Sequence, residues 1–244
     1  VAAIWSMPLN KAREMPLELY LNFFINHGLF KLKDRPQWYT VSSRSRTYVK
    51  KVLENVSGEI FKNYKVNKIS RSNDNVRISI GDEYLDYDHV ILASHADQSL
   101  KMLENPTDDE IRILSKFEYV SNSAILHTDE ELMPKKKLAW SSWNSISKGN
   151  KTCVTYWLNN LQNLKCKDDF FLTLNPIYEI DKANIIKKID FSHPYFNRET
   201  LKLQNSLQSL QGKKRTWYCG AYFGYGFHED GLKSSINLIK NFKI

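Results

Sequence analysis

Glycine is concentrated in one short segment of a chain that otherwise uses it sparingly. The 244 residues include nine glycines, whereas an average usage of about 7% would give about 17. Four of the nine lie close together, at Gly220, Gly224, Gly226 and Gly231. Glycine lets the backbone adopt left-handed conformations and lets other atoms approach it closely. This segment is therefore the first candidate for a functional site.

A predicted strand at residues 215–219 precedes this glycine-rich loop, and a predicted helix at residues 230–242 follows it. In that arrangement a ligand can lie against backbone N–H groups at the positive end of the helix. His228 lies in the loop and is the histidine that we consider as a ligand contact and as a catalytic candidate. The alternative is a purely structural connection, because Glu229 and Asp230 also suit the first turn of a helix.

Most other patterns that mark catalytic or metal-binding sites are missing from the sequence. It has no P-loop and no G-x-G-x-x-G after a strand, so a self-contained dinucleotide-binding domain is not visible. None of the six histidines has a metal-ligand spacing, and no G-x-S-x-G nucleophile elbow occurs. The three cysteines are widely spaced, which predicts no metal site and no disulfide framework and favours a cytoplasmic location.

Composition and charge exclude several classes of protein. A hydrophobic content of 42% with 25% charged residues is typical of a folded chain, and no apolar run is long enough to predict a membrane-spanning helix. The formal net charge of +8 indicates either a nucleic-acid-binding surface or lysines scattered over a solvated surface. We favour the second interpretation and predict no nucleic-acid partner, because the longest basic run, at residues 135–137, has no interleaved aromatic residues.

The order of elements predicts an α/β fold, or α+β in the looser naming. Helices are predicted at residues 17–29, 45–56, 94–103, 107–117, 199–210 and 230–242. Short strands are predicted at residues 64–70, 76–80 and 89–93, the last of them buried in the centre of a sheet. From residue 118 a mostly antiparallel sheet of about five aromatic-rich strands is predicted, at residues 119–127, 138–146, 152–158, 170–175 and 185–191.

Four aromatic residues on adjacent predicted strands are candidates for the wall of an apolar substrate pocket: Trp140, Trp143, Tyr156 and Trp157. The alternative, which we favour on the residues alone, is that these side chains form the core of the sheet.

Several motifs, taken in order along the whole chain, resemble one family of proteins. They are residues 2–6, 26–29, 35–38, 88–93, 95–98, 126–129, 139–144, 173–176 and 226–231. The chain resembles a predicted FAD/NAD-binding oxidoreductase of the flavin-containing amine oxidase superfamily. The resemblance implies a two-domain fold, an FAD cofactor and a small-molecule substrate. It also implies that the strand, G-x-G-x-x-G loop and helix that cradle the FAD pyrophosphate lie before Val1, so that the chain is a C-terminal portion.

The resemblance implies a role in FAD binding for particular residues. Val66 matches the strand whose backbone pairs with the adenine ring, and Ala93 and Ser94 match the strand end that runs past the adenosine half. Gly220 and Ala221 match the start of the motif at the ribityl chain. The rest of that motif, which places a helix N-terminus at the pyrimidine edge of the flavin, matches Gly226, Phe227, His228, Glu229, Asp230 and Gly231.

Two departures from the family pattern stand out. The family has two glycines where this chain has Ser43 and Arg44, which puts flavin contact through that loop in doubt. Ala221 stands where the superfamily often has an acidic residue that holds the ribityl hydroxyls.

The predicted FAD-binding domain comprises residues 38–117 and 194–244, and the predicted substrate domain comprises residues 1–37 and 118–193. The predicted function is an FAD-dependent oxidoreductase that transfers a hydride from an apolar or amine-type substrate to the flavin. The alternative is a truncated, cofactor-free remnant that serves as a binding or structural module.

Overall fold

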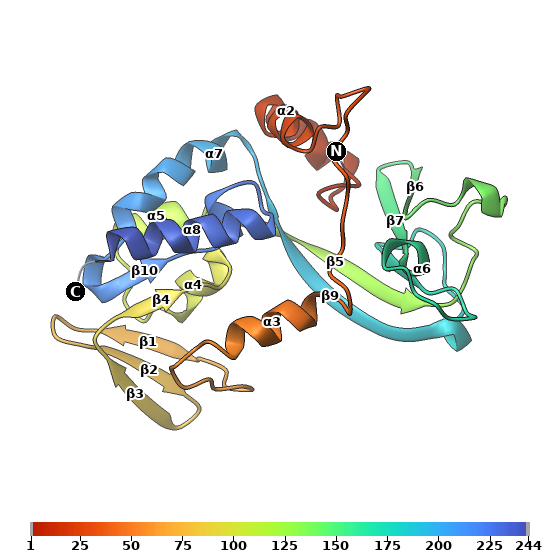
Figure 1. Ribbon diagram of the computed structural model, residues 1–244. Coiled ribbons are helices and arrows are strands. Elements are labelled where there is room, and N and C mark those ends of the chain that lie inside the picture. Colours follow the sequence, from red (N-terminus) through yellow and green to blue (C-terminus); the bar gives the residue numbers. More distant parts are fainter. Residues whose placement is uncertain (1, 243–244) are drawn as a thin grey trace. The chain divides into compact units, whose positions relative to one another are not determined.

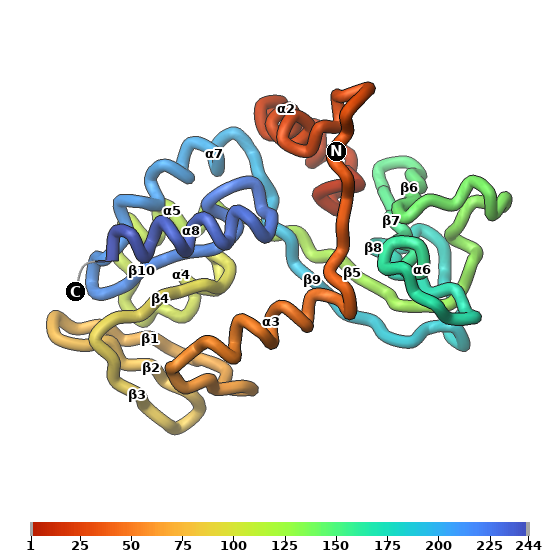
Figure 2. Tube along the Cα trace, in the orientation of Figure 1, coloured from red at the N-terminus to blue at the C-terminus, as the bar shows by residue number. Residues whose placement is uncertain are grey.

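The computed structural model describes residues 2–242 (Figure 1 and Figure 2). The chain divides into two compact units, each built from two stretches of sequence. The first, here the sheet unit, comprises Val1–Glu59 and Val120–His193. The second, here the loop unit, comprises Ile60–Tyr119 and Pro194–Ile244. The expected mixed α/β architecture with an antiparallel sheet is confirmed.

The sheet unit is organised around a sheet with the strand order β6-β7-β8-β5-β9. Strand β7 pairs antiparallel with β6 and β8, and β8 pairs antiparallel with β5. The strands are β5 (Glu118–His127), β6 (Trp143–Lys148), β7 (Lys151–Trp157), β8 (Phe171–Leu174) and β9 (Ile185–Tyr195). The helices of this unit are α1 (Leu9–Glu14), α2 (Leu17–Asn26), α3 (Ser45–Leu53), η1 (Lys137–Ala139), α6 (Leu158–Leu161) and η2 (Lys182–Asn184).

One face of this sheet buries a ladder of polar side chains. His127 Nε2 lies 2.7 Å from Thr173 Oγ1, which in turn lies 2.9 Å from Thr155 Oγ1. The backbone N–H of Asp129 donates to His127 Nδ1 over 3.2 Å. The ring proton therefore sits on Nε2 and is donated to Thr173. Burial lowers the pKa of His127, so the ring is held neutral.

Helix α3 contributes little to the packing of the sheet unit, because none of its side chains is buried. Residues 38–59, which include α3, are grouped with the sheet unit, whereas the sequence prediction placed them with residues 60–117.

The loop unit contains two small sheets. Strands β1 (Lys68–Arg71), β2 (Val76–Ile80) and β3 (Glu83–Tyr87) form an antiparallel sheet, and β4 (Val90–Leu92) pairs parallel with β10 (Thr216–Tyr218). Its longer helices are α4 (Ala96–Met102), α5 (Asp108–Leu114), α7 (Arg198–Gln204) and α8 (His228–Asn241). Its short 3-10 helices are η3 (Asn205–Leu210), η4 (Lys213–Arg215) and η5 (Ala221–Phe223).

A buried ion pair joins three elements of the loop unit. Arg71 on β1 and Glu110 on α5 each have side chains that are 2% exposed, and Arg71 Nη1 lies 2.5 Å from Glu110 Oε1. The hydroxyl of Tyr218, on β10, donates to the same carboxylate over 2.6 Å. Burial alone would raise the pKa of Glu110, but the hydrogen bonds from Arg71 and Tyr218 lower it to about 2.

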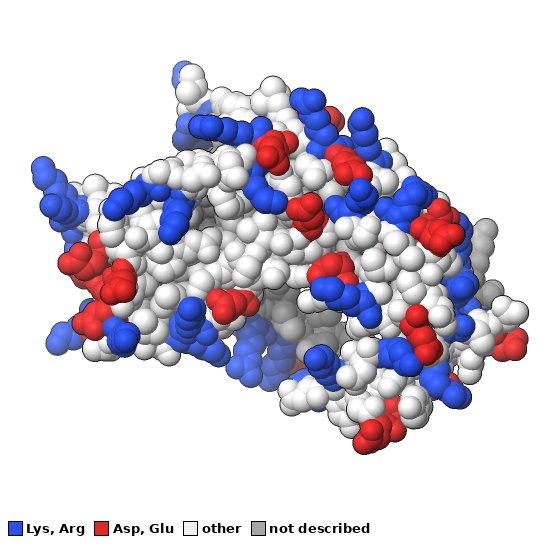
Figure 3. All heavy atoms as spheres, turned by 180° about the vertical axis from the view of Figure 1, so that it is seen from behind, with Lys and Arg blue, Asp and Glu red and all other residues white. Residues whose placement is uncertain are grey.

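Basic and acidic side chains are interspersed on the face of the molecule seen in Figure 3. Among the described residues, no helix is both long and apolar enough to cross a membrane.

We expect Glu110→Gln to lower the free energy of unfolding by about 3–5 kcal/mol, because it leaves the Arg71 cation buried without its partner. The matched control is Glu104→Gln, which breaks an ion pair with Lys68 whose side chains are 37% and 51% exposed. Such an exposed pair contributes at most about 1 kcal/mol. Urea denaturation of both variants checks the difference, and equal losses would contradict the role given to the buried pair.

We also expect acid to destabilise the sheet unit through His127. Its pKa is lower in the folded chain than the value of about 6.5 in the unfolded chain, so the folded form binds fewer protons. The neutral His127 ring therefore makes its full contribution to the free energy of unfolding above about pH 6.5, and this contribution decreases as the pH falls below that value. Urea denaturation at a series of pH values measures this effect. Acidification should lower the free energy of unfolding less in His127→Gln than in the original chain, because glutamine does not take up a proton. The same loss in both proteins would show that His127 is not the group responsible.

Candidate functional site

The predicted cofactor residues Val66, Ala93 and Ser94 line one groove of the loop unit. This groove has a volume of about 800 Å³. It is lined by Lys65, Val66, Asn67, Ile91, Leu92, Ala93, Ser94, Gln98, Lys101 and Met102. The structure therefore brings together residues that lie almost 30 positions apart in the sequence.

The groove lies where two parallel strands end. The register of β4 and β10 pairs Leu92 with Tyr218, the last residue of each strand. The next backbone N–H, that of Cys219, donates to the Leu92 carbonyl over 3.1 Å. In parallel α/β sheets, ligands bind in the crevice outside the carboxyl ends of the strands. Ser94 and Gly220 both lie just beyond those ends.

Gly220 occupies a position that a larger residue does not fit. Its φ is 152°, and a Cβ atom there would lie 2.8 Å from the Tyr222 ring and 3.8 Å from the Ser94 carbonyl oxygen. The backbone N–H of Gly220 donates to Ser234 Oγ over 2.9 Å, and Ser234 Oγ donates to the Gly231 carbonyl over 2.7 Å. The end of β10 is thus tied directly to α8.

The remaining glycines of the loop serve different purposes. Gly226 has a φ of 92°, and a Cβ atom there would lie 2.9 Å from the Phe196 ring, so this glycine permits both the turn and the packing. A Cβ atom on Gly224 would overlap the carboxylate of Asp230. Gly231 has room for a Cβ atom, whose nearest neighbour would be the Ala221 nitrogen at 3.8 Å.

The first turn of α8 offers unused hydrogen-bond donors. Asp230 caps this helix by accepting from the Phe227 N–H over 2.9 Å, which confirms the structural use of an acidic residue at the helix start. Within residues 2–242, no acceptor is paired with the backbone N–H groups of His228 and Glu229. Both side chains are exposed. The positive end of α8 is therefore available to an electron-rich group.

Two residues that the sequence analysis did not single out hold the loop in place. Gln204, at the end of α7, donates from Nε2 to the Tyr222 carbonyl over 3.1 Å and to the Gly224 carbonyl over 2.5 Å. Ser234 bridges Gly220 and α8 as described above. No local pattern in the sequence identifies either residue, because their partners lie 14 to 20 positions away.

The four candidate pocket aromatics do not share one face of the sheet. Trp143 is paired opposite Tyr156, and their rings contact each other at a centroid distance of 5.1 Å. Trp157 is the next residue after Tyr156 on β7, so its side chain lies on the other face, where it contacts Trp140 at 5.2 Å. Trp140 also contacts Phe171 of the core. The prediction that all four residues line one pocket is therefore wrong, because side chains alternate between the two faces along β7.

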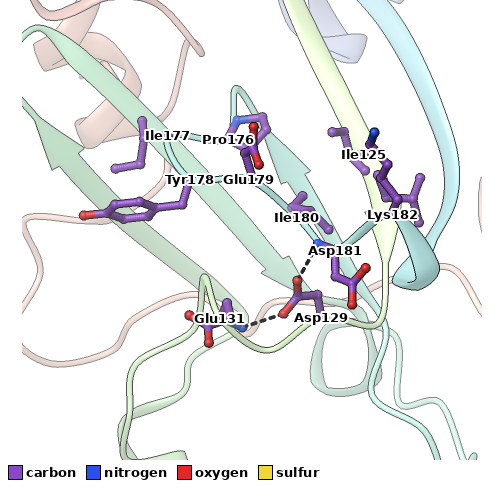
Figure 4. Close-up of a pocket in the computed structure, with 11 residues that line it drawn as sticks. Ile125, Asp129, Glu131, Pro176, Ile177, Tyr178, Glu179, Ile180, Asp181 and Lys182 are labelled. Carbon is purple, nitrogen blue, oxygen red and sulfur yellow. Dashed lines mark hydrogen bonds between the residues drawn. The ribbon is translucent and has the colours of Figure 1, made fainter.

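A second groove, of about 830 Å³, lies in the sheet unit (Figure 4). Asp129, Glu131, Glu179 and Asp181 are among its lining residues. The Asp129 carboxylate accepts from the backbone N–H groups of Glu131 and Asp181, at 3.0 and 2.9 Å, so it has a structural use. In the part of the chain that the structure describes, no group of three or more His, Cys, Asp or Glu residues could hold a metal ion.

Comparison with known families decides where the chain belongs. The family described as "Flavin containing amine oxidoreductase" matches residues 23–162, more than half of the chain. The chain belongs to this family. No curated protein matches the chain significantly.

Solved structures share the fold of this flavin amine oxidoreductase chain at low sequence identity. A CLA-producing fatty acid isomerase from P. acnes is 15% identical with a TM-score of 0.60, and the match covers 82% of this chain and 52% of that one. A protein from Exiguobacterium sp. 255-15 is 10% identical with a TM-score of 0.60, over 92% and 57% of the two chains. A putrescine oxidase variant is 8% identical with a TM-score of 0.54, over 82% and 53%. The chain thus spans about half the length of the solved structures that it matches.

Ser43 and Arg44, at which the family resemblance places two glycines, have backbone conformations that favour glycine. Ser43 and Arg44 have left-handed φ values of 61° and 72°. Arg44 combines its φ with a ψ of 171°, in a region essentially restricted to glycine. Both positions therefore adopt backbone conformations that favour glycine, although they carry side chains.

We expect Arg44→Gly to raise the free energy of unfolding by about 1 kcal/mol, because glycine adopts this conformation without the steric cost of a Cβ atom. Arg44→Ala is the matched control, since it removes the charge and keeps the Cβ atom. Thermal or urea unfolding measures both variants. A gain of the same size in Arg44→Ala would show that the charge, and not the backbone conformation, is responsible.

Proposed function

We propose that this chain forms part of an FAD-dependent oxidoreductase and holds the flavin along the edge where β4 and β10 end. One observation supports this proposal: two features meet at that edge. One is the groove lined by Val66, Ala93 and Ser94, and the other is the end of β10, which Ser234 attaches to α8. The chain's membership of the flavin-containing amine oxidoreductase family also supports the proposal.

The residues present fit the chemistry of FAD. The groove has room for the adenosine half, with the Val66 backbone at the adenine and Ala93 and Ser94 beside the sugar. Gly220 and Ala221 would lie along the ribityl chain. The free N–H groups of His228 and Glu229 would face the pyrimidine edge, where hydrogen-bond donors stabilise the negative charge of the reduced ring. Gly226 would let the loop turn beside Phe196, and Gly231 would lie on the first turn of α8 next to the flavin.

FAD, when bound, supplies an acceptor for a hydride from the substrate. The contributions of this chain are then position and charge rather than acid or base catalysis. His228 is exposed, and we propose that it contributes its backbone N–H rather than its imidazole.

The substrate is proposed to be a small molecule of apolar or amine type. Two solved structures that share the fold are named as a fatty acid isomerase and a putrescine oxidase variant, and these names support the proposal. We further propose that the loop unit belongs to the FAD-binding part of the enzyme and the sheet unit to its substrate-binding part.

We expect the 244-residue chain alone to bind FAD weakly, because it lacks a G-x-G-x-x-G loop for the pyrophosphate. Joining a strand–glycine-loop–helix unit to its N-terminus should restore binding, measured by the visible absorbance and fluorescence of bound flavin. In that joined protein His228→Ala should retain the flavin, because the backbone donor survives.

Two outcomes would contradict these expectations. Stoichiometric flavin on the 244-residue chain alone would show that the glycine loop is not required. A folded, joined protein that binds no flavin would contradict the proposed site itself and favour a cofactor-free binding or structural module.

A further inference from the structure

The sheet unit contains a pocket that the proposed flavin site does not use. Its volume is about 480 Å³, within the range of roughly 300–1,000 Å³ that is typical of small-molecule sites. It lies near the β6–β7 turn and the end of β8. The N-terminal segment closes one side, where the Leu9 N–H donates to the Asn150 carbonyl over 3.2 Å.

The charged side chains among the described lining residues of this pocket are positive. They are Lys151 and Lys188, and these lining residues include no Asp or Glu. Among the residues that the structure describes, neither lysine forms an ion pair, whereas Lys137 of the same unit pairs with Asp169 at 2.6 Å. Two cations without a protein counter-ion attract an anionic ligand.

The lining includes a buried hydroxyl, the Oγ atom of Ser123. Within residues 2–242 this atom has no hydrogen-bond partner. Asn175 fixes the backbone of Ser123 through two hydrogen bonds. The Asn175 Oδ1 accepts from the Ser123 backbone N–H over 3.0 Å, and the Asn175 backbone N–H donates to the Ser123 carbonyl over 2.8 Å. Asn175 is itself held by Asn122 Oδ1 at 2.6 Å. A buried hydroxyl without a partner is unfavourable, and a ligand oxygen that accepts from it would offset this cost.

Most of the remaining lining is apolar and includes Met7, Pro8, Val120, Ile125 and Pro176. We propose that this pocket binds a small organic carboxylate with a short apolar chain. The carboxylate accepts from Ser123 and lies near Lys151 and Lys188, and the chain packs on the apolar residues. Such a ligand would bind in the absence of flavin.

Isothermal titration calorimetry of the 244-residue chain with sodium hexanoate tests the proposal. We expect saturable binding at one site, weakened about tenfold for hexan-1-ol and for hexylammonium, which lack the negative charge. Inorganic phosphate, which lacks the apolar chain, should also bind about tenfold more weakly. The absence of hexanoate binding, or equal binding of phosphate or hexan-1-ol, would overturn the assignment.

Variants then locate the site. Lys188→Met should weaken hexanoate binding about tenfold. Lys187→Met, which makes the same change one residue away on β9, should alter it less than about twofold, because neighbouring side chains on a strand point to opposite faces. Ser123→Ala should weaken binding about fivefold without lowering the thermal stability, since its hydroxyl has no protein partner. Wild-type affinity in both Lys188→Met and Ser123→Ala would place hexanoate elsewhere and overturn the proposal.

Discussion

The buried ion pair between Arg71 and Glu110 is the contact on which the loop unit depends. Both side chains are only 2% exposed, so each charge must be satisfied by the other and by the protein groups around them. Arg71 also donates to the Asn105 carbonyl over 2.8 Å, and the Thr107 N–H donates to Glu110 over 2.7 Å. The pair therefore fixes β1 against the start of α5.

The same pair fixes the point at which β10 ends. Tyr218, the last residue of that strand, donates its hydroxyl to Glu110, and its register partner on β4 is Leu92. The chain then passes through Gly220, which Ser234 attaches to α8. A contact in the core thus determines where the glycine loop begins and where the first turn of α8 presents its free N–H groups.

Local sequence patterns predicted much of this arrangement. The cluster of glycines indicated a strand–loop–helix connection, and this prediction is confirmed. The apolar run at residues 89–93 indicated a strand buried in the centre of a sheet. That prediction is correct for the strand but wrong for its burial, because β4 belongs to a two-stranded sheet of the described residues and Ile91 is 44% exposed. The partners of Glu110 were not predictable, because Arg71 and Tyr218 lie 39 and 108 residues away along the chain. Pairing at such distances leaves no periodic signal in the sequence.

Strand boundaries were the other source of error. A strand was predicted at residues 138–146, but the chain forms η1 at Lys137–Ala139 and β6 only from Trp143. Trp140 therefore lies outside the strands, and the alternation along β7 separates Tyr156 from Trp157. A shift of this size changes which face a side chain occupies, so pocket walls are less predictable than the glycine loop.

Hydrogen exchange measured with and without FAD, on the chain joined to a glycine-loop unit, tests the central claim most directly. If the flavin lies along the ends of β4 and β10, FAD should slow exchange of the amides at residues 93–94 and 226–231 and leave the β6–β7 hairpin unchanged. Protection confined to the sheet unit, or none at residues 226–231 in a protein that has bound flavin, would contradict the account.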